Sequence, residues 1–353
     1  MKGTLSLSNG QSFQGIWKGA AKDVQGEIVF FTGMTGYEEV LTDPSYHGQI
    51  IVFSYPLMGQ YGIQTAHLES EVIQPAGIIV TELYEGALEK GISLFDFALQ
   101  HNVPIMSGVD TRSVIQTIRE DGTMQAVMQL EGKPLPAWKP IRTFLVPHVT
   151  AKTITTHGEG FPHIGLIDFG YKKSILQALL DRGCKVTVFP YTVTTDVLSA
   201  YQLDGLLFSN GPGDPASLEH KLADYKEWAT NYPSLGICLG HQLLASAFGA
   251  STEKLPFGHR GANHPVMNMK TNRVSMSSQN HSYVVKKDSL PDSLSVLYLN
   301  VNDNSIEGVQ HNELPFITVQ FHPEASPGPA EHHEVFDTFF DLIPFEKKVS
   351  THA

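Results

Sequence analysis

Residues 234–250 read SLGICLGHQLLASAFGA, a short apolar run joined directly to a sequence with helical spacing. The apolar run predicts a buried strand, and the residues that follow it predict a helix. Cys238 stands between Gly236 and Gly240, which permit a strand-to-helix turn too sharp for a Cβ atom. The stretch therefore predicts a strand, a tight turn and a helix, with a cysteine presented at the apex of the turn.

The sequence before this stretch alternates between strand-like and helical patterns. HIGLIDF (163–169) and KVTVFPY (185–191) are apolar runs, and KKSILQALLDR (172–182) between them has leucine and isoleucine at helical spacing. Strand, helix and strand in this order form a βαβ unit, which implies a parallel sheet. DGLLFSN (204–210) predicts a further buried strand. We therefore expect residues 161–353 to form a doubly wound α/β domain that binds ligands at the C-terminal ends of its strands.

The first part of the chain has a pattern richer in strands. TLSLSNGQSFQGIW (4–17) alternates apolar and polar residues on both sides of an Asn-Gly pair, which predicts a β-hairpin. GEIVFFTG and GQIIVFSYP are later β-like runs. Asp110 precedes an apolar helical stripe that Gly122 ends. We expect residues 1–160 to form a β-rich α+β domain, with a boundary in the polar stretch 146–162.

Composition narrows the class of protein. The chain has 353 residues, 41% of them hydrophobic, which is typical of a globular protein with two domains. A formal net charge of -12 argues against a nucleic-acid surface. The sequence contains no run of roughly eighteen apolar residues, so it predicts no membrane span. The N-terminus has the pattern of a strand rather than that of a signal peptide. With two cysteines and no export signal, we expect a cytoplasmic protein without disulfides.

Cys238 is a candidate nucleophile. A thiol at a helix N-terminus faces the positive end of the helix dipole, which favours the thiolate. The backbone N–H of Leu239 points into the same space and could stabilise an oxyanion. The alternative is a small apolar residue that fills a buried turn. For Cys184, which has no such turn around it, we expect this structural role.

QFHPEASPGP (320–329) supplies a candidate base. On an extended backbone, residues i and i+2 face the same way, so His322 and Glu324 can lie side by side. Pro323 favours that extended path. Glu324 could then accept a hydrogen bond from one ring nitrogen and leave the other facing a thiol. The alternative is a surface ion pair without a catalytic role.

SNGPGDP (209–215) follows the DGLLF strand and exposes backbone N–H groups, of which that of Gly211 could provide a second oxyanion donor. The alternative is a turn without a role. It is not a phosphate loop, because the G-x-x-x-x-G-K-[ST] pattern is absent. EHHE (331–334) lacks the spacing of a zinc motif, so we expect no metal site, and we expect a structural role for His241.

Together, GICLGHQ, HPE and SNGPGDP resemble the class I glutamine amidotransferases. TGMTGYEEVLTDPSYHGQIIVFSYP and SGVDTRSVIQTIREDG, in the first half, resemble the N-terminal domain of the small subunit of glutamine-dependent carbamoyl phosphate synthetase. The resemblance runs from about residue 3 to residue 345. It implies that the chain is such a glutaminase subunit.

The resemblance implies a mechanism that agrees with the residues. Cys238 attacks the side-chain amide of glutamine, and the N–H groups of Leu239 and Gly211 hold the oxyanion. His322, oriented by Glu324, protonates the departing ammonia. Water then hydrolyses the γ-glutamyl thioester.

The resemblance also implies a partner. Ammonia would pass to a large subunit that uses ATP, magnesium and bicarbonate to make carbamoyl phosphate, in a heterodimer or a higher-order oligomer. No cofactor is then expected on this chain. The product could serve arginine or pyrimidine biosynthesis. Two other readings stay open: a glutaminase or Cys-His hydrolase with a different substrate or acceptor, and an inactive binding or regulatory module.

The resemblance carries over a set of glutamine-binding positions: Ser45, Gly211, Gly213, Leu239, Gln242, Asn280, Ser282 and Tyr283. At Ser282 the sequence departs from the family, which usually has glycine there; a positive φ would strain serine. Sequence physics alone would read TDPSY, which contains Ser45, as a β-turn.

Overall fold

Two units make up residues 1–344, the part of the chain that the computed structural model describes. The first unit contains Met1–Thr143 with two short later segments, Leu255–Asn263 and Ser326–Gly328. The second contains Phe144–Lys254, His264–Ala325 and the described residues from Pro329 onward. The domain boundary at residue 160 stays a prediction.

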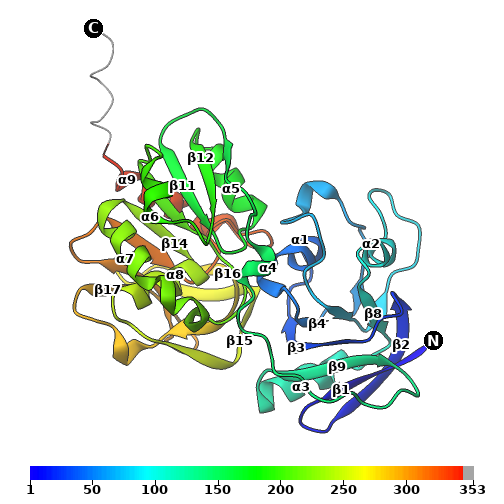
Figure 1. The fold of residues 1–353 in the computed structure, drawn as a ribbon. Coiled ribbons are helices and arrows are strands. Elements are labelled where there is room, and N and C mark those ends of the chain that lie inside the picture. Colours follow the sequence, from blue (N-terminus) through cyan, green and yellow to red (C-terminus); the bar gives the residue numbers. More distant parts are fainter. Residues whose placement is uncertain (345–353) are drawn as a thin grey trace. The chain divides into compact units, whose positions relative to one another are not determined.

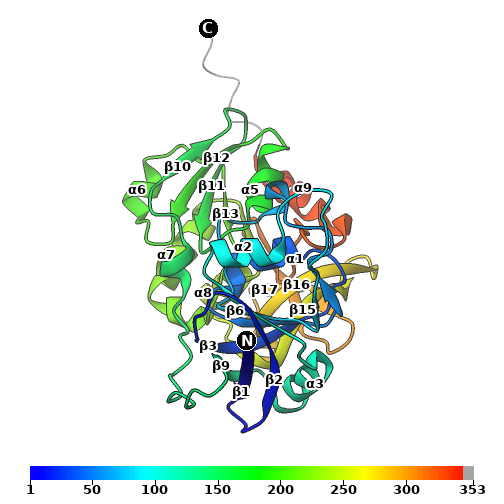
Figure 2. The same cartoon turned by 90° about the vertical axis from the view of Figure 1, so that its right-hand side faces the viewer.

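A closed seven-stranded barrel forms the first unit. The predicted hairpin is confirmed, because β1 and β2 pair antiparallel on either side of a turn that contains Gly10 at φ 93°. Figure 2 shows β2, β1 and β9 side by side. The strands β3, β4, β6 and β8 pair in parallel, which the sequence did not predict. In barrel order the strands are β1 (Lys2–Leu7), β2 (Ser12–Gly19), β8 (Pro104–Ser107), β6 (Gly77–Ile79), β4 (Ile50–Phe53), β3 (Val24–Phe31) and β9 (Met124–Leu130).

Both faces of the parallel strands in this unit are buried. Along β3, Ile28 and Phe30 join one apolar core while Val29 and Phe31 join another. This explains why its sequence is a continuous apolar run rather than an alternating one. Helix α3 packs on the first core, and Asp110 caps it by accepting a hydrogen bond from the Ser113 N–H, as predicted. The other elements of the unit are α1 (Tyr37–Thr42), η1 (Pro44–Tyr46), β5 (Leu57–Met58), η2 (Thr65–His67), β7 (Glu82–Leu83), α2 (Leu94–Gln100) and α3 (Thr111–Asp121).

The second unit is built on a ten-stranded mixed sheet, of which Leu255–Asn263 within one strand, β15, is the segment assigned to the first unit. Figure 1 labels several strands of this sheet, among them β11, β12 and β14. The strands β12, β11, β13, β14 and β19 are parallel, which confirms the predicted α/β core. An antiparallel extension, β18, β16, β15 and β17, continues the sheet and was not predicted. In sheet order the strands are β10 (Thr155–His157), β12 (Lys185–Pro190), β11 (His163–Asp168), β13 (Gly205–Phe208), β14 (Ser234–Ile237), β19 (Phe316–Val319), β18 (Ile306–His311), β16 (Val274–Val285), β15 (Thr252–Asn268) and β17 (Leu294–Asn300).

Helices cover both faces of this sheet, as a doubly wound fold requires. The apolar sides of α5 and α9 belong to one core, and those of α6, α7 and α8 belong to the other. Among residues 1–344, no helix has both the length and the apolar character needed to cross a membrane. The helical elements are α4 (Val146–Val149), α5 (Lys173–Leu180), α6 (Thr195–Ser199), η3 (Pro215–Lys221), α7 (Leu222–Asn231), α8 (Leu239–Ala247), η4 (Lys287–Ser289), η5 (Ala330–His332) and α9 (Glu334–Asp341).

Three of the parallel strands end at one edge of the sheet, and each of them is followed by one of the predicted sequence motifs. β13 leads into the glycine-rich loop, β14 into Cys238, and β19 into His322. These three strands are neighbours in the sheet, in the order β13, β14, β19. The fold therefore gathers residues that lie more than a hundred positions apart in the chain at one place, where a sheet of this kind binds its ligand.

Candidate active site

The turn at Cys238 has the geometry that the glycines predicted. Cys238 lies between β14 and α8 with φ 53° and ψ -102°, a backbone conformation that residues with a side chain rarely adopt. A Cβ on Gly236 would lie 2.8 Å from the Gly240 carbonyl oxygen, and one on Gly240 would lie 2.1 Å from the Phe208 carbonyl oxygen. Glycine is required at both positions because strand and helix approach so closely.

The two cysteines lie in different surroundings. The Cys238 sulfur is 3.7 Å from the Asn280 carbonyl oxygen and 3.6 Å from the side-chain nitrogen of Gln320. Cys184 is packed among apolar side chains, and burial raises the pKa of its thiol to about 12. Cys184 is therefore inert by environment, whereas polar groups approach the Cys238 sulfur.

His322 and Glu324 form a buried pair. His322 Nδ1 and Glu324 Oε1 are 2.6 Å apart, and the two residues are 3% and 4% exposed. The i, i+2 expectation holds, and the alternative of a surface ion pair is wrong because both side chains are buried. Lys172 completes the set: its Nζ is 3.0 Å from Glu324 Oε1 and 2.6 Å from the Ala325 carbonyl oxygen.

The charges of this set shift its pKa values in opposite directions. Burial alone would lower the pKa of His322, but the Glu324 charge, the nearby Cys238 thiol and the hydrogen bond that the ring donates to Glu324 outweigh it, so this pKa lies well above the usual range. Burial alone would raise the pKa of Glu324, and the charges of Lys172 and His322 hold it well below the usual range instead. The set therefore favours an imidazolium ring beside the thiol.

The two residues predicted to supply oxyanion donors lie close to the turn at Cys238. Leu239 is the first residue of α8, so its N–H has no acceptor within the helix. Gly211 lies in the adjacent loop, close to the turn. A Cβ on Gly211 would be 3.0 Å from Leu239 Cδ2 and 2.4 Å from the Phe169 carbonyl oxygen. Gly213 in the same loop has φ 96°, which favours glycine. The loop and the turn are also joined directly, since the Gly240 N–H donates to the Ser209 carbonyl oxygen.

The predicted glutamine-binding residues of the second unit lie around this turn. Gln242 donates from its side-chain nitrogen to the Tyr283 carbonyl oxygen at 2.8 Å, and the Tyr283 hydroxyl donates to Asp214 Oδ2 at 3.0 Å. Asn280 contacts the Cys238 sulfur through its carbonyl oxygen. The structure thus brings the residues on α8, on β16 and in the glycine-rich loop together.

Ser282, where the sequence departs from the family, and Ser45, in the predicted turn, are the remaining two positions. Ser282 lies inside β16 and is not among the residues with positive φ, so serine is unstrained there. Ser45 lies in the first unit, where TDPSY forms a capped 3-10 turn: its N–H donates to Asp43 Oδ1 at 2.9 Å. The turn reading of this segment is correct within that unit, and glutamine binding by Ser45 stays a prediction.

Sequence reasoning missed Lys172 and Gln320. Lys172 follows β11 at the same edge of the sheet, and nothing in its local sequence distinguishes it from Lys173. Gln320 could have been found, because Thr318, Gln320 and His322 alternate along one extended segment and so face the same side. That side faces α8 in the structure: Thr318 Oγ1 is 2.7 Å from His241 Nδ1, and Gln320 contacts Gln242.

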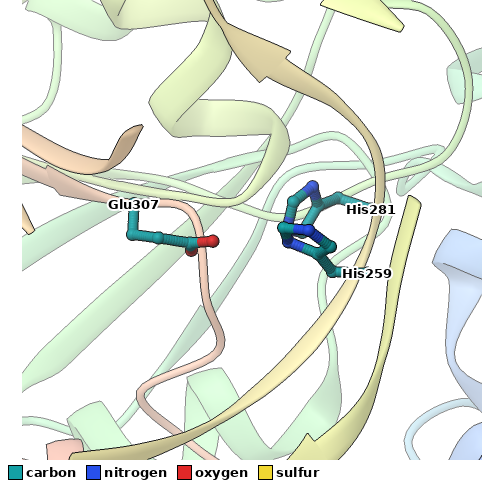
Figure 3. Close-up of side chains that lie close together, drawn as sticks. All are labelled: His259, His281 and Glu307. Carbon is teal, nitrogen blue, oxygen red and sulfur yellow. The ribbon is translucent and has the colours of Figure 1, made fainter. Parts of the chain in front are cut away.

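Other buried histidines have structural partners. His241 is fully buried, and burial lowers its pKa to about 3. His332, from the EHHE segment, has its Nε2 3.1 Å from Ser275 Oγ and a pKa that burial lowers to about 4. Figure 3 labels His281 of β16 and Glu307 of β18 from the second unit, with His259 from the first. Within the second unit, His281 Nδ1 is 3.0 Å from the Tyr283 carbonyl oxygen, and Glu307 Oε1 accepts from the Asn300 side chain.

Comparisons with known proteins show which family the chain is similar to. The class I glutamine amidotransferase family matches residues 165–342, and the CPSase domain of the carbamoyl-phosphate synthase small chain matches residues 5–128. The carbamoyl phosphate synthase arginine-specific small chain of Halalkalibacterium halodurans is 52% identical over the full length of both chains. That of Bacillus subtilis is 49% identical over 99% of each chain. The carbamoyl phosphate synthase small chain of Listeria monocytogenes is 42% identical over 100% of this chain and 99% of the relative.

Proposed function

Because the chain belongs to the family of carbamoyl phosphate synthase small chains and is a glutamine-hydrolysing amidotransferase, we propose that Cys238 is the nucleophile of that hydrolysis. One observation carries the proposal. Cys238 is held in a rare backbone conformation at the edge of the sheet where the buried His322–Glu324 pair also lies. Strained backbone conformations of this kind persist only where the surrounding structure enforces them, and they cluster at active sites.

The first half of the reaction forms a thioester. The Cys238 thiolate attacks the side-chain amide carbon of glutamine, and the carbonyl oxygen becomes an oxyanion that the N–H groups of Leu239 and Gly211 stabilise. The C–N bond then breaks, and the imidazolium of His322 gives its proton to the departing ammonia. Glu324 accepts a hydrogen bond from His322 Nδ1, so the proton that moves is the one on Nε2.

The second half regenerates the thiol. Neutral His322 accepts a proton from water as that water attacks the thioester carbon, and the same two N–H groups hold the second oxyanion. Collapse of this intermediate releases glutamate and returns the sulfur as thiolate beside the protonated ring. No cofactor takes part in these steps.

Glutamine is bound by the residues around the turn. The backbone of Gly211, Gly213 and Leu239 and the side chain of Gln242 would hold the substrate, together with Asn280, Ser282 and Tyr283 of β16. Because the Gln242 nitrogen already donates to the protein, its side-chain oxygen is the atom offered to the substrate. Ser45 would contribute from the first unit.

The ammonia is passed to a large subunit that uses ATP, magnesium and bicarbonate to make carbamoyl phosphate. Two of the relatives are named arginine-specific small chains, which supports arginine biosynthesis as the use of the product. This division of labour calls for a complex with the large subunit, as a heterodimer or a higher-order oligomer, and we expect that complex in the cytoplasm. Pyrimidine supply is the other use, and growth of a deletion strain with arginine or with uracil distinguishes the two.

Ammonia release from glutamine tests the proposal. We expect slow release by this chain alone, faster release with its large subunit, and loss of release in Cys238→Ser. Cys184→Ser is the matched control and should keep the activity, since Cys184 is packed in the apolar core. Equal release by Cys238→Ser would contradict the proposal. Release of ammonia without formation of carbamoyl phosphate would indicate a different acceptor. No release of ammonia by the complex would indicate an inactive module.

A further inference from the structure

We propose that Gln320 is a positioning residue that holds the Cys238 sulfur by donating a side-chain N–H to it. The proposal rests on the proposed role of Cys238 as nucleophile and goes beyond the triad of Cys238, His322 and Glu324. Gln320 lies directly after β19, and its Nε2 is 3.6 Å from the Cys238 sulfur.

A chain of hydrogen bonds fixes the direction in which the Gln320 amide points. The Tyr283 backbone carbonyl can only accept, so the Gln242 side chain must turn its nitrogen toward it, at 2.8 Å. The same nitrogen is 3.0 Å from Gln320 Oε1 and donates its second hydrogen there. If the Gln320 amide were flipped, two NH₂ groups would face each other. The nitrogen of Gln320 therefore faces the sulfur.

The sulfur receives two contacts that favour different protonation states. The Asn280 carbonyl oxygen, 3.7 Å away, is an acceptor and can interact favourably only with the S–H form. The Gln320 N–H is a donor, and it interacts most strongly with the thiolate. Gln320 thus offsets the carbonyl and supports the ionised form that attacks the substrate.

Burial makes this donor effective. Gln320 is fully buried, and Gln242 and Cys238 are 3% and 2% exposed, so water competes little for any of these groups. The position of Gln320 is fixed from the backbone as well, because its own N–H donates to the Glu307 carbonyl oxygen at 2.8 Å. Because hydrogen bonds fix both its backbone and its side-chain oxygen, Gln320 is already oriented with its N–H toward the sulfur before the substrate binds.

Two variants separate the donor from the packing. Gln320→Glu keeps an oxygen for the Gln242 nitrogen and the shape of the side chain, but it places an acceptor against the sulfur. Gln320→Met keeps the length and removes the donor. Gln310→Met is the matched control, since Gln310 lies in the neighbouring strand β18 of the same unit.

The measurement is the rate at which iodoacetamide alkylates Cys238 as a function of pH, in the complex with the large subunit. The buried Cys184 of the same molecules should stay unmodified while the protein is folded, so its alkylation reports unfolding. We expect alkylation of Cys238 near neutral pH to fall roughly tenfold or more in Gln320→Glu and to recover as the pH is raised. Gln320→Met should shift the profile in the same direction by less. Gln310→Met should follow the wild type.

An unchanged pH profile in both folded Gln320 variants, with native thermal unfolding, would overturn the proposal. A loss of rate that is equal at every pH would also overturn it, because that result indicates a packing role alone. Neither result would affect the role of Cys238, which the hydrolysis assay of Cys238→Ser decides separately. Conversely, full hydrolysis by Cys238→Ser would remove the nucleophile whatever the alkylation profile shows.

Discussion

Cys238 stores backbone strain that a substitution can measure. At φ 53° and ψ -102°, a residue with a Cβ is strained by about 1–3 kcal/mol, and glycine is not. We expect Cys238→Gly to be more stable than Cys238→Ala by about 1 kcal/mol or more, although both lack the thiol and should be inactive. Chemical denaturation of the two variants measures the difference.

Cys184 provides the control for this comparison. It is as buried as Cys238, but its φ is not in the left-handed region. There the greater freedom of unfolded glycine dominates, so Cys184→Gly should be less stable than Cys184→Ala, by roughly 1 kcal/mol. The same order of stability at both positions would show that the Cys238 turn is unstrained.

Lys172 should matter through Glu324. In Lys172→Met, the buried Glu324 carboxylate loses the charge 3.0 Å away and keeps only its contact with His322. Removing one partner of a buried ion pair costs about 3–5 kcal/mol. We expect a loss of that order in the free energy of unfolding. Lys173→Met, an exposed neighbour, should leave the free energy of unfolding close to the wild-type value.

The site residues that could be predicted from the sequence are those marked by a local sequence pattern. Cys238 is marked by its two glycines, and His322 and Glu324 by their spacing around a proline. Lys172 and Gln320 have no comparable marks, because their partners Glu324 and Cys238 are 152 and 82 positions away in the chain. Only the packing of β11, β14 and β19 in one sheet brings them into contact.

The helix that follows the nucleophile depends on one close approach. A Cβ on Gly240 would lie 2.1 Å from the Phe208 carbonyl oxygen of β13, so Gly240→Ala must push α8 away from the sheet. Overpacking of this kind costs about 1–3 kcal/mol. We also expect hydrolysis to fall at least tenfold, because α8 carries Cys238 and the Leu239 N–H at its start.

Gly249 at the other end of α8 separates backbone strain from displacement. Its φ is 108°, and a Cβ there would meet no atom within 4 Å. Gly249→Ala should therefore lower stability while leaving hydrolysis by the folded protein near the wild-type rate. Denaturation and ammonia release, measured on both variants, check the pair. A Gly240→Ala protein with wild-type hydrolysis would contradict the close-approach argument.

The elements with strong periodicity were predicted, and the pairings between distant strands were not. The hairpin of β1 and β2, the capped helix α3 and the βαβ unit of β11, α5 and β12 all have short-range signals. Closure of the barrel joins β2 to β8 and β1 to β9 across most of the first unit. Pairing over such separations depends on tertiary packing, which a local pattern does not encode.

For the whole molecule, the buried charges give stability a distinct pH dependence. The pKa of Glu324 is lowered in the folded protein, so its contribution is present above the usual carboxyl range of about 4.3 and is lost as pH falls. The pKa of His322 is raised, so its contribution is present below about 6.5 and is lost as pH rises. Both contributions are complete only between these values.

Glu324→Gln tests this window. The variant removes the Glu324 carboxylate charge, which raises the pKa of His322 and is itself stabilised by Lys172. We expect its deficit in unfolding free energy to be largest near pH 5.5 and smaller at about pH 3 and about pH 9. Urea unfolding of both proteins across this range measures it. A deficit that does not change with pH would show that the pair contributes through packing alone.

The most direct test of the account is the identity of the atom that bonds to the substrate. The complex with the large subunit would be mixed with glutamine and quenched in acid during turnover, and its peptides would be analysed by mass spectrometry. We predict a γ-glutamyl adduct on the peptide that contains Cys238 and none on the peptide that contains Cys184. An adduct on another residue, or an unmodified Cys238 while glutamine is being consumed, would contradict the mechanism.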